Sequence, residues 1–284
     1  MLSILIPIYN YNGIKLVTDL QAQAMALGIE FEIIVADDHS PNPPKANEAI
    51  NLLAFAKYIY LPTNLGRSGS RNWLAQKAQY PYLLFIDGDM GVRTDDFLRK
   101  YLDVLSENRV VCGGHFYDAQ PPSDEFLLHW IYGRNREERP ANERNKAPYQ
   151  GFVPSNFVIP KDLFLSIEFD ESIKGYGHED TIFGETLQKR NVEVLHLDNG
   201  LAHLGLSTNE EFMDKVDVAV KNLRFLEEKY DFTGTRLQQM AKRLKLFTPF
   251  LRLIPKAFLR KQVVEKHQLW MLDLYKLREL TRIQ

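Results

Sequence analysis

The chain has very few cysteines: Cys112 is the only one among 284 residues. A single cysteine excludes an intramolecular disulfide framework and a cysteine-rich zinc site. No uncharged apolar run is long enough to cross a bilayer, and the first residues enter a strand pattern without the basic and apolar regions of a secretory signal. We therefore expect a cytoplasmic protein, or one held peripherally on the inner face of the membrane.

A glycine-rich dinucleotide fingerprint is also absent. No Gly-x-Gly-x-x-Gly follows the first apolar run, residues 2–8, and this weighs against a dinucleotide oxidoreductase. The composition, 45% hydrophobic and 25% charged, is that of an ordinary soluble globular protein. The length allows one large α/β domain with an appendage, or two domains.

Strands and helices are predicted to alternate over the first ninety residues. The apolar run at residues 82–86 has the pattern of a strand buried on both faces. This alternation predicts a mostly parallel, doubly wound sheet. The expected strands are residues 2–8, 31–36, 58–61 and 82–86, and the expected helices are 14–27, 46–56 and 70–78. Further helices are expected over residues 95–105, 161–166, 181–190 and 209–230, and strands over 110–112 and 192–197.

Carboxylates gather at three turns: Asp37-Asp38, Asp87-Gly88-Asp89 and Glu179-Asp180. Open α/β sheets bind ligands at the carboxyl ends of their strands. Paired carboxylates suit Mg²⁺ or Mn²⁺, and a glycine between them lets a metal and a polyphosphate approach the backbone. An isolated Asp-Gly-Asp can also be an ordinary acidic turn. Residues 64–72, rich in small side chains and arginine, open a helix and form a natural phosphate-binding surface.

Two segments leave alternatives open. Residues 115–150 are polar and charged, and we expect a mobile insertion with a short helix around 126–132; it is either a lid or a solvated loop. From residue 236 onward the chain has twelve Lys/Arg and three Asp/Glu, a local net charge of +9. Since the net charge of the whole chain is −2, the preceding residues carry −11. This asymmetry suggests an anionic partner.

Apolar residues interleave with the basic ones in this tail. The pattern fits a basic amphipathic helix on an anionic membrane surface, and equally a segment that packs on the catalytic domain or on a second subunit. The residues concerned are Leu244, Leu246, Phe247, Phe250, Leu251, Leu253, Ile254, Phe258 and Leu259.

Six segments together resemble the family-2-type glycosyltransferases of the GT-A fold. They are residues 3–10, 33–40, 64–72, 84–89, 152–171 and 175–184, in the order of that family. The run Gly175-Tyr176-Gly177-His178-Glu179-Asp180 is similar to the Gly-Trp-Gly-Gly-Glu-Asp turn of β-galactosyltransferases and chondroitin-synthase-like enzymes. The resemblance implies a Rossmann-like, mostly parallel sheet flanked by helices over residues 1–205. A helical extension would follow over 206–284, basic and amphipathic from about 236.

The resemblance also implies roles for individual residues. Asp180 would be the general base, and Asp89 and His203 would bind Mn²⁺ or Mg²⁺. Asn156, His178 and Glu179 would contact the sugar substrates. The nucleotide would be bound by Pro7, Tyr9, Asp37, Asp38, Arg71 and Asp87.

The implied reaction is inverting transfer of a hexose or N-acetylhexosamine from a UDP-sugar to a hydroxyl of a glycan or lipid-linked glycan. Two alternatives stay open: a nucleotidyltransferase acting on sugar phosphates, and a non-catalytic nucleotide- or glycan-binding protein on the same fold. Contact of the tail with a membrane surface is one of the two interpretations of its pattern. We expect no nucleic-acid partner. Whether the chain forms a homo-oligomer stays open.

Overall fold

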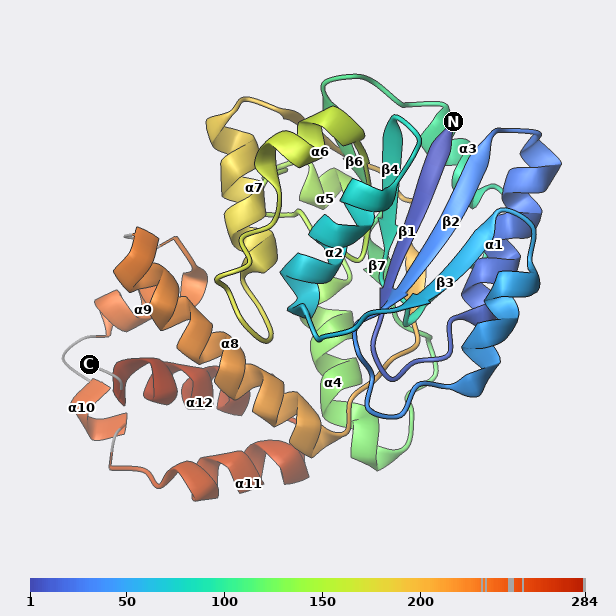
Figure 1. The fold of residues 1–284 in the computed structure, drawn as a ribbon. Helices are drawn as coiled ribbons and strands as arrows, with labels where there is room; N and C mark the ends of the chain where they lie inside the picture. Colours follow the sequence, from blue (N-terminus) through green and yellow to red (C-terminus); the bar gives the residue numbers. More distant parts are fainter. Residues whose placement is uncertain (231, 233, 245–247, 252, 283–284) are drawn as a thin grey trace. The chain divides into compact units, whose positions relative to one another are not determined.

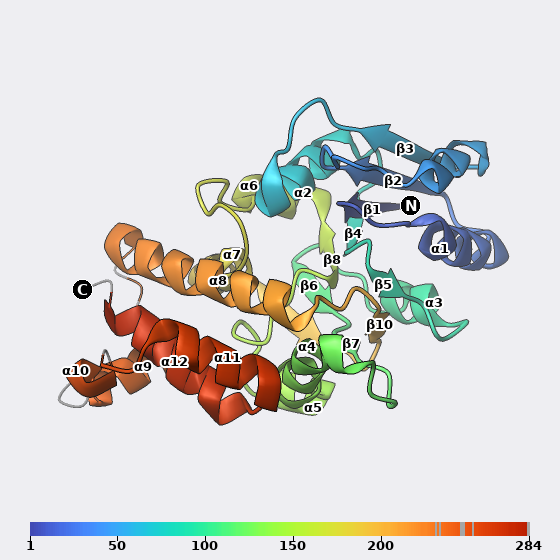
Figure 2. The same ribbon diagram turned by 90° about the horizontal axis from the view of Figure 1, so that it is seen from below.

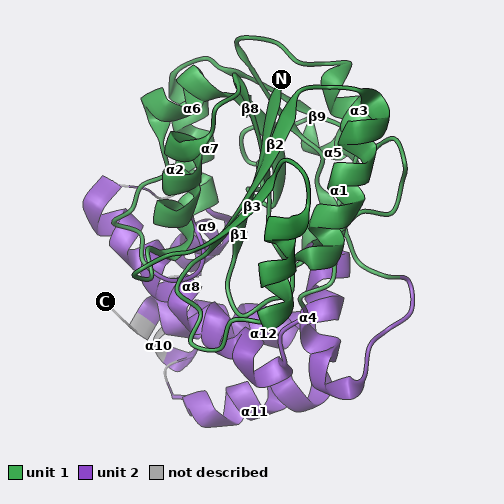
Figure 3. Ribbon diagram, turned by 45° about the vertical axis from the view of Figure 1, so that its right-hand side comes forward, with its two compact units in different colours: residues 1–118, 137–174, 179–205 green, residues 119–136, 175–178, 206–284 purple. Residues whose placement is uncertain are grey.

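The computed structural model describes residues 1–230, 232, 234–244, 248–251 and 253–282 (Figure 1). The chain divides into two compact units (Figure 3). Unit 1 comprises Met1–Asp118, Glu137–Lys174 and Glu179–Gly205, and unit 2 comprises Ala119–Arg136, Gly175–His178 and Leu206–Gln284. Each unit therefore draws on stretches of chain that are far apart in sequence.

A seven-stranded sheet forms the centre of unit 1, in the order β3-β2-β1-β4-β8-β6-β9 (Figures 1 and 2). Strands β1 to β4 run parallel, β6 and β9 pair in parallel, and β8 is antiparallel to both its neighbours. The predicted mostly parallel α/β sheet is confirmed. The strands are β1 (Leu2–Ile8), β2 (Phe31–Asp37), β3 (Ala56–Tyr60), β4 (Tyr82–Ile86), β6 (Arg109–Cys112), β8 (Asn156–Pro160) and β9 (Glu193–His196).

Both faces of this sheet are covered by helices. Successive side chains of a strand point to opposite sides, so each strand contributes apolar residues to both faces. Ile4 of β1 and Leu84 of β4 pack with α1 (Ile14–Leu27) and α3 (Phe97–Leu102). Leu5 and Phe85 pack on the other side. The helices there are α2 (Gly66–Lys77), α6 (Lys161–Ile167) and α7 (Glu179–Lys189) (Figure 3). The sheet is thus the middle layer of three, which holds its strand ends in fixed positions.

Two predicted helices are shorter than expected. The helix predicted over residues 46–56 is the 3-10 helix η1 (Lys45–Leu52), and Phe55 turns the chain into β3 with φ +62°. The helix predicted over 95–105 is confined to α3. Hydrophobic spacing located both elements, but their ends depend on local turns that the spacing does not encode.

A second, three-stranded sheet lies in unit 1, in the order β5-β10-β7. Its strands are β5 (Met90–Gly91), β7 (His115–Phe116) and β10 (Leu201–His203). Strand β10 pairs antiparallel with β5 and parallel with β7. Three short segments that are distant in sequence therefore meet directly after Asp89.

The short helix predicted around residues 126–132 is confirmed, but the prediction of a mobile loop is wrong for much of the rest of segment 115–150. It contains β7, the 3-10 helix η2 (Asp124–Phe126), α4 (Leu127–Tyr132), the π-helical turn η3 (Gly133–Glu137) and α5 (Ala141–Arg144). Arg144 is buried, and its guanidinium donates to the carbonyls of Cys112, Gly113 and Leu197 and lies 2.9 Å from His196 Nδ1. Backbone carbonyl oxygens accept the hydrogen bonds of this buried cation, so Arg144 fixes the segment to the sheet although the composition of the segment is highly charged.

Unit 2 is helical, with α8 (Asn209–Tyr230) as its longest element. The tail helices are α9 (Arg236–Arg243), α10 (Thr248–Leu251), α11 (Lys256–Lys266) and α12 (Leu269–Arg282). Leu259, Val263 and Leu272 are buried against Phe212 and Met213 of α8. Part of the tail therefore packs on α8 of its own unit. Leu246 and Phe247 lie outside the described residues.

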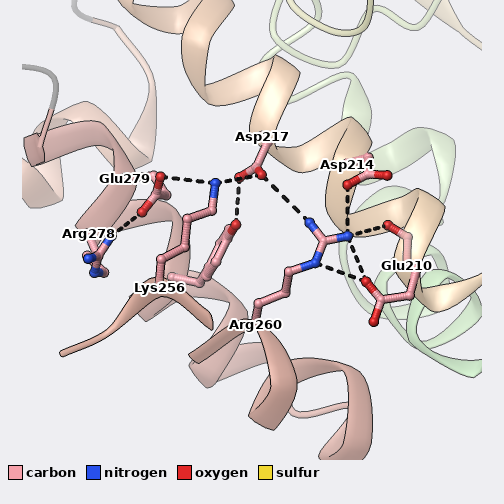
Figure 4. A network of polar contacts seen from close by, with 8 residues as sticks. Glu210, Asp214, Asp217, Lys256, Arg260, Arg278 and Glu279 are labelled. Carbon is pink, nitrogen blue, oxygen red and sulfur yellow. Dashed lines mark hydrogen bonds and ion pairs between the residues drawn. The ribbon is translucent and has the colours of Figure 1, made fainter. Parts of the chain in front are cut away.

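A network of ion pairs joins the same helices (Figure 4). Arg260 of α11 contacts Glu210 at 2.7 Å and Asp214 at 2.8 Å, both on α8. Asp217 of α8 accepts from Lys256 at 2.8 Å and from the Tyr275 hydroxyl at 2.7 Å. Carboxylates of α8 thus neutralise part of the basic excess of the tail. Among the described residues, no helix has the length and apolar composition of a membrane span.

Candidate active site

The turn after β2 carries two carboxylates that have different surroundings. Asp37 is fully buried, and its two oxygens accept from the Ser40 amide at 2.8 Å and the Tyr58 hydroxyl at 2.9 Å. Burial, and then this hydrogen bond to Asp37, raise the pKa of Tyr58. Asp37 therefore holds the turn together from a buried position.

Asp38 follows β2 in the chain, and its side chain lies at the N-terminus of α2. Its oxygens accept from the backbone amides of Leu65 at 2.7 Å and Gly66 at 2.8 Å. The N-cap residue of α2, Leu65, has no side chain that can accept from these amides, so the carboxylate of Asp38, distant in sequence, accepts from them instead. Burial raises the pKa of Asp38, although both hydrogen bonds oppose the shift. Each oxygen keeps a second lone pair that can accept from a base N–H.

Pro7 and Tyr9 lie at the end of β1, beside this turn. The Pro7 carbonyl accepts from the Gly88 amide at 3.2 Å, which ties β1 to the Asp-Gly-Asp turn. A Cβ atom added at Gly88 would lie 2.2 Å from Ile8 Cγ2. Gly88 is thus required by the approach of β1 to the turn, and not only by space for a ligand. Tyr9 is exposed.

Arg71 has partners within the protein. Its side chain is only 2% exposed and forms an ion pair with Asp87, and it also donates to the Arg67 carbonyl at 3.2 Å. The guanidinium carbon lies 5.6 Å from the centre of the Phe169 ring. Arg71 therefore orients Asp87, and its expected contact with a base or diphosphate stays a prediction. The arginine of this motif with an exposed side chain is Arg67.

Asp89 and His203 are brought together by the small sheet. Asp89 Oδ2 lies 3.7 Å from His203 Nε2, and the Asp89 carbonyl accepts from the Leu204 amide at 2.9 Å. The Asp89 side chain is 32% exposed and that of His203 is 14% exposed. A Cβ atom added at Gly205 would lie 2.4 Å from Asp89 Oδ2, so Gly205 leaves room for this carboxylate.

This pair can be tested as a metal site by its donor atoms. A carboxylate oxygen and an imidazole nitrogen are both acceptable to Mn²⁺, whereas Mg²⁺ prefers oxygen donors. Among the described residues, no group of three or more His, Cys, Asp or Glu side chains could hold a metal ion. Asp89 and His203 therefore fit an ion whose remaining ligands are substrate phosphates and water.

Glu179 and Asp180 begin α7. Glu179 is buried, with Oε1 3.8 Å from Arg67 Nη1. Asp180 is half-buried, and its Oδ1 accepts from the Thr181 amide at 2.7 Å. Burial raises the pKa of both carboxyls, and the neighbouring Asp180 charge raises that of Glu179 further. The positive charges of Arg67 and Arg71 oppose these shifts of the pKa.

Two further residues were expected to contact the sugar substrates, Asn156 and His178. Asn156 is fully buried, donates to the carbonyls of Gly114 and Asn199, and accepts from the Tyr101 hydroxyl at 2.6 Å. It therefore joins core elements, and its contact with a sugar stays a prediction. His178 belongs to unit 2, where it has φ +74°. This left-handed conformation favours glycine, the residue of the similar turn in the enzymes that this chain resembles.

Several residues near these groups were missed from the sequence. Tyr58 and Gly205 give no sequence signal, because each acts on an aspartate that is distant along the chain. Tyr11 lies near Asp89: burial, and then the Asp89 charge, raise the pKa of Tyr11. The tyrosine-rich loop after β1 was the only hint for this residue.

Comparison with known proteins was made against families, curated proteins and solved structures. A family model described as "Glycosyl transferase family 2" matches residues 3–165. An "Uncharacterized glycosyltransferase" from Haemophilus influenzae is 30% identical over 118 residues, which are 39% of this chain. The match spans 44% of that relative, less than half of its length.

Solved structures give the same fold. S. aureus TarS 1–349 in complex with UDP is 18% identical with a TM-score of 0.52, and S. aureus TarS 1–349 is 18% identical with a TM-score of 0.50. Each likeness covers 99% of this chain and 91% of the TarS chain. At this identity the likeness shows the fold alone.

The sheet order and the likeness to the TarS structures define the fold as the GT-A fold. The chain belongs to glycosyl transferase family 2. The family and the fold expected from the six sequence segments are thereby confirmed.

Proposed function

We propose that this glycosyltransferase moves a hexose or N-acetylhexosamine from a UDP-sugar to a hydroxyl of a glycan or lipid-linked glycan, with inversion. The observation that carries the proposal is the meeting of Asp89 and His203, 3.7 Å apart, from segments separated by more than a hundred residues. A TarS structure in complex with UDP has the same fold, and this supports UDP as the nucleotide.

In this proposal Asp38, Pro7 and Tyr9 hold the base. Asp38 accepts from its N–H with the lone pairs that α2 leaves unused. Asp87, which Arg71 holds in place, accepts from the ribose or the sugar. Arg67, whose side chain is exposed beside Glu179, would contact the diphosphate.

Asp89 and His203 would bind Mn²⁺ or Mg²⁺, which when bound neutralises charge on the departing diphosphate. Asp180 takes the proton from the acceptor hydroxyl at its free oxygen, while the Thr181 amide fixes the other one. Burial raises the pKa of Asp180, which favours its acceptance of a proton, and Glu179 beside it would hydrogen-bond the acceptor sugar. These roles need no residue outside unit 1.

The test is a panel of UDP-sugars with Mn²⁺ or Mg²⁺, measured by UDP release and by thermal stabilisation. We expect one UDP-sugar to be hydrolysed slowly and to stabilise the protein, and an acceptor to accelerate UDP release. Stabilisation by none of the UDP-sugars would contradict the donor assignment. Stabilisation without release, at any acceptor, would favour the non-catalytic binding protein. If UTP and a sugar phosphate are supplied instead, formation of a UDP-sugar with release of pyrophosphate would favour a nucleotidyltransferase.

We further propose that the exposed part of the tail contacts an anionic membrane surface. Phe250, Leu253, Phe258 and Trp270 are more than half exposed, which is unusual for large apolar side chains so close in sequence. Lys242, Arg243 and Lys266 are exposed in the same segment. Aromatic side chains with neighbouring cations are the composition that binds the interface of an anionic bilayer.

A further inference from the structure

A layer of polar and aromatic side chains surrounds the imidazole of His203. The Tyr117 ring lies 5.2 Å from the His203 ring at an interplanar angle of 32°, and the His115 ring lies 5.8 Å from it. Both neighbours come from β7 and the residue that follows it, and β7 pairs with the strand that carries His203. The orientation of the imidazole is therefore limited by two rings that belong to no predicted site.

One carboxylate, that of Glu137, joins these two rings. Glu137 Oε2 accepts from the Tyr117 hydroxyl and lies 3.5 Å from His115 Nε2. Tyr117 is 2% exposed, and the His115 side chain is 9% exposed. The Glu137 side chain is 27% exposed, but the groups that it contacts are buried. The hydrogen bond from the Tyr117 hydroxyl opposes rotation of that ring, because rotation would leave a buried polar group without a partner, and His115 Nε2 lies within ion-pair distance of the same carboxylate.

The same layer reaches the other end of the Asp-x-Asp turn. His115 Nδ1 lies 3.2 Å from Ser155 Oγ, and the Ser155 carbonyl accepts from the Asp87 amide at 3.1 Å. Glu137 is thus connected to His203 through ring contacts and to Asp87 through His115 and Ser155.

The position of Glu137 in the chain is itself fixed. It is the last residue of the π-helical turn η3, and the chain then passes through Arg139 to the buried anchor Arg144, which donates to the Arg139 carbonyl at 3.0 Å. The next residue, Glu138, accepts from the Tyr117 amide at 3.2 Å. A π-helical turn inserted at this point aims the carboxylate at β7, and such turns occur often at functional sites.

We propose that Glu137 is a positioning residue for metal binding: it holds Tyr117 and His115 so that the imidazole of His203 stays directed at Asp89. The inference rests on the proposed function, in which Asp89 and His203 hold the metal ion. Partners that orient a metal-binding histidine commonly change metal affinity by about 10- to 100-fold when they are removed.

The experiment is a titration of Mn²⁺ in the presence of UDP, read from the electron paramagnetic resonance of the free ion, together with UDP binding without metal. We expect Glu137→Ala to weaken Mn²⁺ affinity at least about tenfold, with metal-free UDP binding unchanged. Glu137→Gln should restore most of the affinity, because its amide oxygen still accepts from the Tyr117 hydroxyl. The control is Glu143→Ala, which removes the same charge from an exposed position of α5 and should bind Mn²⁺ as the wild type does.

Tyr117→Phe tests the same connection and removes only one oxygen atom. It should weaken Mn²⁺ binding, and adding it to Glu137→Ala should have no further effect, because both changes break one hydrogen bond. Wild-type Mn²⁺ affinity in both single variants would overturn the inference.

Asp89→Asn and His203→Ala separate this inference from the proposed function. If these two variants lose Mn²⁺ binding while Glu137→Ala keeps it, only the positioning role fails. If they too bind Mn²⁺ normally, the metal assignment fails, and the positioning role fails with it.

Discussion

Substitution of Gly205 by alanine should disturb the proposed metal site at Asp89 and His203 without removing any charged group. The added methyl group would lie 2.4 Å from Asp89 Oδ2 and 2.5 Å from Asp89 Cβ, where ordinary contact begins at 3.4 Å. One of the two residues must therefore move by about 1 Å, whereas metal–ligand distances tolerate only about 0.2 Å. Overpacking of this kind typically costs about 1–3 kcal/mol of stability.

We expect Gly205→Ala to weaken Mn²⁺ binding in the presence of UDP at least about tenfold, measured by titration, and to lower the melting temperature. Gly13→Ala is the matched control: the nearest atom to its added methyl group, Ile8 Cγ2, lies at 3.8 Å, an ordinary contact. This control should leave Mn²⁺ binding unchanged. If Gly205→Ala binds Mn²⁺ as tightly as the wild type, Asp89 is not the metal-binding carboxylate that we describe.

Three further predictions concern the base, the ion-pair network and the tail. Asp180→Asn should lower kcat/KM about 10²- to 10⁴-fold while UDP binding persists. Because the folded-state pKa of Asp180 is raised, the folded state binds more protons than the unfolded chain, and stability falls as pH rises through the folded pKa. The same variant should therefore raise the melting temperature at neutral pH but not below pH 3.8, the ordinary pKa of the group; an unchanged melting temperature at both would argue against the raised pKa. Arg260→Met should lower the free energy of unfolding, measured with denaturant, by roughly 1–3 kcal/mol. Lys261→Met removes an exposed, isolated ion pair with Glu265 and should change it by no more than about 0.5 kcal/mol. Equal effects would show that the network adds no stability. Phe258→Ser combined with Trp270→Ser should reduce sedimentation with anionic vesicles by about tenfold or more, and the exposed Leu52→Ser serves as control; undiminished sedimentation would leave the tail without a membrane role.

Much of unit 1 was predictable because its sheet is buried on both faces. Mostly apolar strands such as residues 2–8 and 82–86 must be buried on both faces, which requires a layer of helices on each side of the sheet. The alternation of predicted strands and helices along the sequence indicated these helices. Segment 115–150 could not be predicted, since Arg144 obtains its partners from backbone carbonyls that carry no sequence signal. The same holds for the tail, whose charges are partly neutralised by carboxylates of α8.

The candidate site divides in a similar way. Carboxylates at strand ends, such as Asp38 and Asp89, could be located from the sequence because parallel strands end at one edge of a sheet. The burial of Arg71 and Asn156 could not, because a polar residue in a motif gives no indication of which side it faces. Contacts across the small sheet, including that of His203 with Asp89, depend on strand pairing of two or three residues, too short for any periodic signal.

The most direct test of the account is the position of Mn²⁺ in crystals grown with UDP, determined by anomalous scattering at the manganese edge. We predict one peak about 2.0–2.3 Å from both an Asp89 oxygen and His203 Nε2, in contact with the diphosphate of UDP. The same map should place the base of UDP beside Asp38. A manganese peak away from Asp89, or UDP bound elsewhere than at the Asp38 turn, would contradict the assignment of this edge as the donor site.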